Sequence, residues 1–349
     1  MIKNRSFPER FSPGLVVMSI AVILANMGGP DSIEAVEPFL YQIFKDKDII
    51  DIPLSAFLRD RFARWLARRR SPESRHIYEK LGGKKPLTDI AYEQARLVQQ
   101  SLNRNNTAKY QVFTAMRYWH PFMEDVWHTI VSQNFDKLVV VSLYPFYSTT
   151  TTGSLEKLVR RLNERTPFHG KHLNIVTRFG SHPMFIQTIV RQIESALAAS
   201  SETEFRDILF SAHSIPMGRI NQGDPYQREV EQTIAQIRQQ LSGKLNIHLS
   251  YQSKLGPVKW LGPSTPDKIK ELAANGVRNL LVYPMGFVAD NSETVYEIGM
   301  LYRELAESLG LKKFLRIEAL NTNAEFIATL QSIVLEQIKE IQSAEQRPA

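Results

Sequence analysis

Short apolar runs alternate along this chain with segments of helical length and period, and this alternation restricts its fold more than any other feature. Eight runs have the length and composition of buried strands: residues 16–26, 110–118, 137–144, 173–179, 207–214, 247–252, 279–287 and 314–320. Between them lie segments with helical periodicity, among them 92–102, 123–131, 185–198 and 228–241. Strands that alternate with helices predict a parallel sheet with helices on both faces.

The predicted strands divide into two similar halves of four. The run LVVVSLYP at 138–145 resembles LLVYP at 280–284, and each is followed about 35 residues later by the last strand of its half. This duplication predicts an α/β fold of two similar doubly wound domains, each with a four-stranded parallel sheet, and a ligand cleft between them. We place the first domain at 1–181 and the second at 182–321. A C-terminal helix within 322–349 is expected to pack back on the core and to end in a short disordered tail.

The first half contains an insertion that the second half lacks. Its first two strands begin about 94 residues apart, against about 40 in the second half, so about 50 extra residues lie at roughly 45–85. An insertion at the carboxyl edge of a parallel sheet is typical of a lid or lip. Large apolar residues recur there at helical spacing among arginines: Leu54, Phe57, Leu58, Phe62, Trp65 and Leu66, with Arg59, Arg61, Arg64, Arg68, Arg69 and Arg70. Such a helix suits an anionic membrane surface, or docks on the sheet with a solvated basic face.

Charge and cysteine content exclude several classes of site. The chain has no cysteine, which excludes disulfides, thiolate zinc sites, a cysteine nucleophile and a cysteine-ligated iron–sulfur cluster. A net charge of +7 favours anionic partners, but no nucleic-acid-binding motif is present. The apolar run at 14–25 is too short to cross a bilayer, and we expect a cytoplasmic protein.

One histidine stands where open α/β sheets bind their ligands. The run ILFSAHSIP ends a predicted strand at His213 and then meets a proline. An imidazole with a pKa of about 6.5 exchanges a proton near neutrality. The same position also suits a histidine that merely hydrogen-bonds a carbonyl at the strand end.

Two glutamates follow the seventh predicted strand. Glu293 and Glu297 are four residues apart, so they share one face of the predicted helix. Paired carboxylates guide a divalent cation or pass protons, but acidic residues also occur in first turns because they complement the helix dipole. This strand and the strand of His213 end at the same edge, so we expect the histidine and the carboxylates to converge.

Seven segments, in this order, resemble the signature blocks of the ferrochelatase family. They are LANMGGPDS, IFKDKDIIDIP, TAMRYWHP, SLYPFYSTTTTGSL, FSAHSIPMGRINQGDPY, SYQSKLGPVKWLGPSTPD and GFVADNSETVYEI, and they span about 20–298. The resemblance implies two similar doubly wound domains around a porphyrin. It also implies that ferrous iron is a substrate inserted into that porphyrin, with release of two protons, and that no tightly bound cofactor is needed.

The resemblance also implies roles for individual residues. His213 matches the catalytic histidine of the family, and Glu293 matches a carboxylate expected on the opposite side of the macrocycle; both are candidate metal ligands. Pocket positions are matched by Met27, Arg117, Tyr118, Trp260, Phe287 and Asn291. The helix with Phe62, Trp65, Leu66 and Arg70 matches a membrane-facing lip, which implies peripheral contact with the inner membrane.

The sequence departs from the family pattern at three places. Asn291 stands where most relatives have histidine, and Gly299 replaces a usual acid, so fewer titratable groups line that side. Lys84 and Lys85 stand where Gly-Ser is common. Met27 resembles the branch that uses protoporphyrin IX. A coproporphyrin enzyme, a chelatase for cobalt or nickel, and a non-catalytic porphyrin or haem carrier remain the alternatives.

Overall fold

The computed structural model describes residues 17–50, 52–53, 55–82, 86–104, 106–170, 172–200, 205–241, 243, 245–254 and 256–345. Its helices, in chain order, are α1 (Val36–Lys45), α2 (Ala56–Lys80), α3 (Pro86–Arg104), α4 (Met123–Val131), α5 (Thr152–Arg165), α6 (Pro183–Ala199), α7 (Met217–Asn221), α8 (Tyr226–Leu241), α9 (Thr265–Ala274), the π-helix η1 (Glu293–Tyr302), α10 (Arg303–Ser308) and α11 (Ala324–Glu345). Lys84 and Lys85 lie outside the described residues.

Two parallel four-stranded sheets form the framework, as the alternation of strands and helices predicts. The first has the order β2-β1-β3-β4, with β1 at Ser19–Asn26, β2 at Lys109–Met116, β3 at Lys137–Ser142 and β4 at His172–Val176. The second has the order β6-β5-β7-β8, with β5 at Asp207–His213, β6 at Asn246–Gln252, β7 at Asn279–Met285 and β8 at Lys313–Arg316. All pairs are parallel, and in both sheets the chain crosses over at the same point of the order. The predicted fold class is confirmed.

Six of the eight strands end earlier than the apolar runs that predicted them. β7 stops at Met285 because Gly286 has a φ of 88°, a left-handed conformation that leaves the ladder. β2 likewise stops at Met116, so that Arg117 and Tyr118 follow the strand instead of lying within it. The apolar pattern continues past each strand because the segments that follow are also buried.

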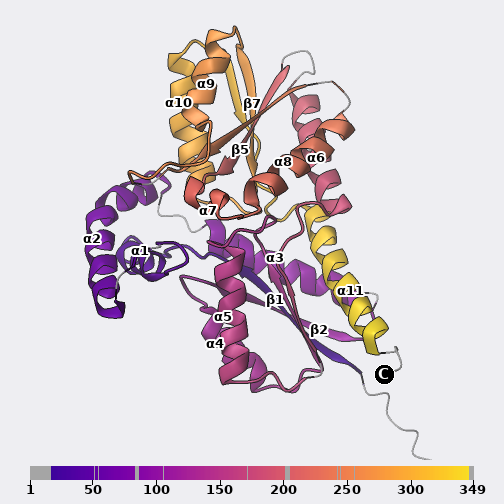
Figure 1. Cartoon of the computed structure of the whole chain (residues 1–349). Coiled ribbons are helices and arrows are strands. Elements are labelled where there is room, and N and C mark those ends of the chain that lie inside the picture. Colours follow the sequence, from indigo (N-terminus) through magenta and orange to yellow (C-terminus); the bar gives the residue numbers. More distant parts are fainter. Residues whose placement is uncertain are drawn as a thin grey trace, which may run out of the picture.

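Side chains on the two faces of each sheet enter different cores. Ile23 of β1 and Val140 of β3 pack with α4 and α5 on one face of the first sheet. Leu209 of β5 packs with α9, η1 and α10 on one face of the second. The other faces of both sheets share a single core with α3, α6, α8 and α11, and Figure 1 shows α11 running beside the half that contains β1 and β2.

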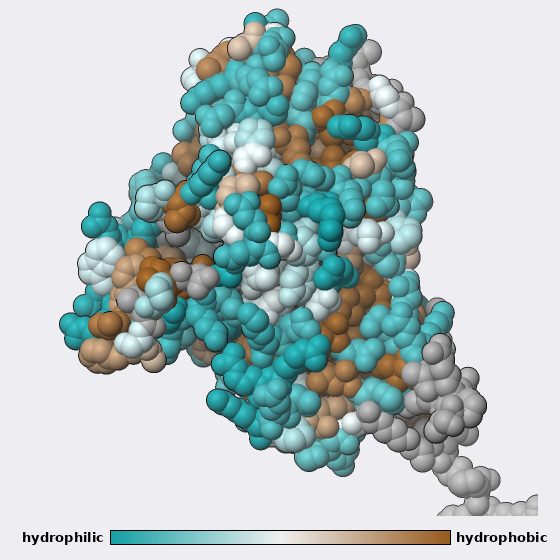
Figure 2. Space-filling model, in the orientation of Figure 1, coloured by the Kyte–Doolittle hydropathy of each residue, from teal (hydrophilic) through white to brown (hydrophobic). Residues whose placement is uncertain are grey.

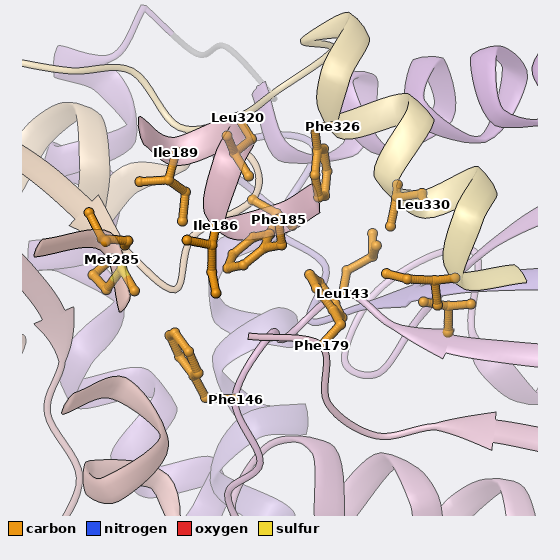
Figure 3. Packing of buried hydrophobic residues seen from close by; sticks show 14 of the residues in the cluster. Leu143, Phe146, Phe179, Phe185, Ile186, Ile189, Met285, Leu320, Phe326 and Leu330 are labelled. Atoms are coloured by element: carbon orange, nitrogen blue, oxygen red, sulfur yellow. The ribbon is translucent and has the colours of Figure 1, made fainter. Parts of the chain in front are cut away.

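Aromatic residues fill the junction between the halves. Phe146, which follows β3, lies with Phe179, Phe185 and Met285 in the shared core (Figure 3). The ring of Phe146 lies so close to Gly180 that a Cβ there would come within 2.3 Å of it. The two halves are therefore joined by continuous packing, while the division at residue 181 and the disordered tail stay predictions.

The insertion of the first half contributes α2, which forms with the preceding α1 a helical hairpin that projects from the body (Figure 1). Its α1 and α2 pack together through a small core that includes Phe39, Phe44 and Ala63. Tyr118 and Trp119, which follow β2, join the same core and fix the hairpin to the first half. No helix among the described residues has the length and apolar content that crossing a bilayer requires.

Candidate active site

The carboxyl ends of β5 and β7 bring a histidine and a carboxylate into contact. His213 is the last residue of β5, and Glu293 is the first residue of η1, which follows β7. Nδ1 of His213 lies 2.9 Å from Oε2 of Glu293. Their side chains are 41% and 31% exposed, so the pair is open to a ligand. The expected convergence of the two strand ends produces this pair.

The contact places both groups on one side of any bound ring. The resemblance implied that Glu293 lies across the macrocycle from His213. A separation of 2.9 Å leaves no room for a ring between them, so that implication is wrong for the structure as it stands. Two carboxylates and one imidazole therefore line the same wall, since Glu297 also acts electrostatically on His213.

The hydrogen bond fixes the state of the imidazole. An ionised carboxylate only accepts, so Nδ1 of His213 must donate to Glu293, and the lone pair of the neutral ring is on Nε2. Partial burial of the ring opposes its protonation, but the charge of Glu293, the hydrogen bond to it and the charge of Glu297 outweigh this effect and raise the pKa of His213. His213 is therefore a base that keeps an accepted proton more firmly than a free imidazole.

Three donors hold the second carboxylate. Glu297 accepts from the backbone N–H of Ser253 at 3.0 Å, from the Ser253 hydroxyl at 2.5 Å and from the Tyr302 hydroxyl. Ser253 has a φ of 64°, a left-handed conformation that is uncommon for serine. Burial and the charge of Glu293 raise the pKa of Glu297 despite these hydrogen bonds. Glu297 is thus suited to take up a proton close to His213.

A buried tyrosine supports the histidine from behind. The Tyr226 hydroxyl donates to the backbone carbonyl of His213 at 2.9 Å. Burial raises the pKa of Tyr226, so the hydroxyl keeps its proton and remains a donor. Trp260 is placed by the segment after His213: residues 215–217 pair with 259–261, and an isolated bridge joins Pro216 to Trp260.

The first half contributes a second group of predicted residues. The backbones of Met27 and Tyr118 are joined, since the Tyr118 N–H donates to the Met27 carbonyl at 3.0 Å. Asp46 accepts from the Arg117 Nη2 at 2.8 Å, the Tyr118 hydroxyl at 2.8 Å and the Ser154 hydroxyl at 2.6 Å. Burial opposes the charge of Asp46, but Arg117 and the hydrogen bonds lower its pKa.

Tyr144 lies within electrostatic reach of both groups. It follows β3 in the first half, and burial raises its pKa. Both Arg117, which lowers this pKa, and Glu293, which raises it, act on the Tyr144 hydroxyl from opposite halves. Phe287 lies on the second side, with its ring 6.5 Å from that of His213. We call Arg117 and Tyr118, in the first half, the first wall, and His213, Glu293 and Phe287, in the second half, the second wall.

Asn291 has a structural contact that the sequence did not indicate. Its side-chain oxygen accepts from the N–H of Glu293 at 2.8 Å and of Thr294 at 3.2 Å, which caps the start of η1. The neighbouring Asp290 is buried and accepts from Arg316 at 2.6 Å. Gly299 lies against that arginine: a Cβ there would lie 3.3 Å from Arg316 Nε. Asn291 and Gly299, two of the departures from the family pattern, thus both have local contacts that fit the residues present.

The lip residues differ in their surroundings. Trp65 is 53% exposed, and its ring centroid lies 5.8 Å from that of Phe62. Leu66 instead packs against the core of the hairpin, and Arg70 pairs with Glu73 at 2.9 Å. At the other end of α2, Tyr78 hydrogen-bonds Ser292, beside Glu293, and burial raises the pKa of Tyr78 to about 12. The lip helix therefore extends from an exposed aromatic end to the start of η1.

Sequence reasoning missed Asp46, Ser154, Tyr226, Ser253 and Tyr302. Asp46, Ser154, Tyr226 and Ser253 lie in segments that carry the family resemblance, so their presence was noted but their partners were not. Those partners are distant in the chain: Ser154 is 108 residues from Asp46. No group of three or more His, Asp or Glu side chains forms a preassembled metal site within the described part of the chain.

The raised pKa of His213 leads to a testable pH dependence. We expect the imidazole of the free protein to titrate above 6.5, and the midpoint to fall in Glu293→Gln because the neutral amide no longer stabilises the imidazolium. The ion pair should stabilise the fold fully below the unfolded-state pKa of about 6.5, and this stabilisation should be lost as the pH rises through the folded-state pKa. NMR titration of the imidazole C–H resonances measures both midpoints. An unchanged midpoint in Glu293→Gln would contradict the pairing.

Comparisons with known proteins show which family this chain belongs to. A family model described as Ferrochelatase matches residues 19–338. A protein named Ferrochelatase from Geotalea uraniireducens (strain Rf4) is 41% identical over 315 residues, which cover 90% of this chain and 96% of the relative. A Ferrochelatase from Aquifex aeolicus (strain VF5) is 39% identical and covers 92% of this chain and 100% of the relative.

Two solved structures share the fold at low sequence identity. SirB from Bacillus subtilis with Fe3+ has a TM-score of 0.53 and 10% identity, covering 91% of this chain and 95% of that one. The sirohydrochlorin chelatase SirB from Bacillus subtilis subspecies spizizenii in complex with cobalt has a TM-score of 0.51 and 9% identity, covering 89% and 92%. These similarities show the arrangement of the two halves.

Proposed function

Since the chain belongs to the ferrochelatase family, we propose that His213 accepts the pyrrole protons while Glu293 balances the resulting charge during insertion of ferrous iron into a porphyrin. The observation that carries the assignment is the 2.9 Å contact between Nδ1 and the Glu293 carboxylate. It leaves the Nε2 lone pair to take a proton, and it stabilises the imidazolium that forms.

The two protons are proposed to leave one after the other. His213 takes the first at Nε2 and releases it to solvent, to which 41% of its side chain is exposed, before Nε2 takes the second. Glu297, whose pKa is raised, is a further acceptor. Before any proton is taken up, the second oxygen of Glu293 and the unprotonated Nε2 of His213 would supply an oxygen and a nitrogen donor to ferrous iron. Iron is a substrate in this scheme, and no resident cofactor takes part.

We propose protoporphyrin IX as the porphyrin, with Met27, Tyr118, Trp260 and Phe287 in contact with the ring. Met27 and Tyr118 are joined through their backbones on one wall, and Phe287 and Trp260 lie on the wall of His213. Arg117 contributes through its pair with Asp46, which orders the first wall. Asn291 acts on the site by capping the helix of Glu293.

Anaerobic addition of ferrous iron and protoporphyrin IX tests this function. Conversion of the free-base absorption spectrum to that of haem is the expected result. Coproporphyrin, and cobalt or nickel in place of iron, are assayed in parallel. Faster metallation of coproporphyrin would replace protoporphyrin IX as the proposed porphyrin, and faster insertion of cobalt or nickel would replace iron as the proposed metal. Porphyrin binding without insertion of any of these metals would favour a carrier.

The projecting hairpin is proposed to rest on an anionic membrane surface. Phe57, Leu58 and Trp65 are exposed on α2, and Figure 2 shows apolar side chains among hydrophilic ones on this projection. Guanidinium groups lie beside them: Arg61 is over the Phe57 ring and Arg69 over the Trp65 ring. An amphipathic surface of this kind suits the headgroup region, and the proposed location is the cytoplasmic face of the inner membrane.

Trp65→Ala is expected to weaken binding to anionic vesicles, because about half of this ring is exposed and is free to enter the interface. Sedimentation with phosphatidylglycerol vesicles should show a several-fold lower bound fraction, and iron insertion into a water-soluble porphyrin should be unchanged. Tyr92→Ala, on α3 in the body, is the matched control, since Tyr92 is 51% exposed. Equal losses in the two variants would argue against the lip as the contact.

A further inference from the structure

We propose that Asp224 is a positioning residue that sets the place of His213 relative to the opposite wall of the cleft. The inference rests on the proposed role of His213 as the base. Asp224 lies in the turn between α7 and α8 of the second half, and its carboxylate is bound by donors from the first half. The residues that hydrogen-bond its carboxylate, Ser148, Thr149 and Tyr226, are not among those proposed to contact the porphyrin or the metal.

The contact made by Asp224 is buried and consists of hydrogen bonds from three donors. One oxygen, Oδ2, accepts from the Thr149 N–H at 2.7 Å, the Thr149 hydroxyl at 2.8 Å and the Ser148 hydroxyl at 3.0 Å. The residue is only 8% exposed. A buried carboxylate with three donors is stable only while those donors stay in place, so the contact resists any relative movement of the halves.

The other oxygen leads to the histidine. Oδ1 of Asp224 accepts from the Tyr226 N–H at 3.1 Å, and the Tyr226 hydroxyl donates to the carbonyl of His213 at 2.9 Å. Tyr226 is itself buried, with its ring 6.2 Å from that of Phe146. Asp224 therefore links the loop after β3 to the backbone of His213, the proposed base, through the side chain of Tyr226.

The loop held by Asp224 also leads to the first wall. Ser148 and Thr149 precede α5, whose Ser154 donates to Asp46 at 2.6 Å and accepts from Arg117 at 3.0 Å. Tyr144 precedes the same loop and lies near both Arg117 and Glu293. The place of the first wall relative to His213 is thus set where this loop meets Asp224.

Another carboxylate, Glu229 in α8, provides a matched control. Glu229 accepts from the Tyr147 N–H at 2.8 Å and from Arg178 at 2.7 Å, so it holds the same loop to the second half. Within the described part of the chain, its side-chain hydrogen bonds lead to Tyr147 and Arg178 and not to His213. Replacing Glu229 removes a similar contact between the halves while leaving the link through Tyr226.

We expect Asp224→Asn to lower the kcat of iron insertion roughly ten- to hundred-fold, because a displacement of tenths of an ångström at the base misaligns proton transfer. The amide presents N–H groups to donors, so one contact turns repulsive. The NMR midpoint of His213 should fall, since a displaced imidazole loses part of its contact with Glu293. Glu229→Gln should keep both kcat and midpoint, with a comparable loss of Tm.

Losses of kcat that follow the Tm losses equally in the two variants, with the His213 midpoint unchanged in both, would show a merely structural role and overturn the inference. If Asp224→Asn does not fold, the double variant Ser148→Ala, Thr149→Val removes two donors and retains the carboxylate, and the same midpoint shift is expected. The NMR titration needs no turnover. If the wild-type protein does not metallate porphyrin, the proposed function is wrong, but the link from Asp224 to His213 can still be measured by the titration.

Discussion

His213→Ala is expected to abolish iron insertion while porphyrin binding is largely kept. The variant loses the only imidazole at this strand end, and positioned general bases contribute about 10²- to 10⁴-fold. Loss of the ring also removes the Nδ1 donor that holds Oε2 of Glu293, so we expect Glu293 to shift as well. Initial rates of haem formation under anaerobic conditions measure the loss, and quenching of protein fluorescence by free-base porphyrin measures binding.

His248→Ala is the matched control for this experiment. His248 also pairs with a carboxylate, Asp207, at 2.9 Å, and it lies on the second sheet, but at the opposite end of its strands. This variant should keep the wild-type rate. Near-normal turnover in His213→Ala would remove His213 from the role of base, and equal losses in the two variants would point to disruption of the sheet.

Phe146→Ala is expected to destabilise both halves at once, by about 3–5 kcal/mol, as for other large-to-small changes of buried phenylalanines. Phe146 is 2% exposed and belongs to the core that the two sheets share. Denaturant titration should show a lower midpoint and a single transition, whether followed by circular dichroism or by tryptophan fluorescence.

Phe57→Ala serves as the control, because Phe57 is 69% exposed and its loss should change the free energy of unfolding by no more than about 0.5 kcal/mol. Two separate transitions in Phe146→Ala, one for each half, would contradict a shared core. A change below about 1 kcal/mol would mean that neighbouring side chains fill the space that the ring leaves.

The framework was readable from the sequence because it depends on local patterns. The run at 207–214 predicted β5, and the structure has it at Asp207–His213. The helix predicted at 123–131 is α4, with the same bounds. Parallel strands in one sheet end at a common edge, so the approach of the η1 glutamates to His213 followed from topology alone.

Side-chain partners were not readable, because they depend on how distant segments meet. The contact between His213 and Glu293 depends on the course of residues 286–292, and it corrected the expected position of Glu293 across the ring. Asn291 looked like a lost titratable group, but its capping contacts need the start of η1 to be known. The π-helical form of η1 itself has no signature in the residue pattern, which reads as ordinary α-helix.

The shared core also has a consequence for synthesis of the protein on the ribosome. α11 covers part of the first half, where it lies against α3, yet its residues are made after all eight strands. The apolar face formed by β1, β3 and α3 is therefore without its native cover for most of translation. We expect the nascent first half to be a client of chaperones, and completion of the fold to wait for a segment more than 140 residues beyond β4.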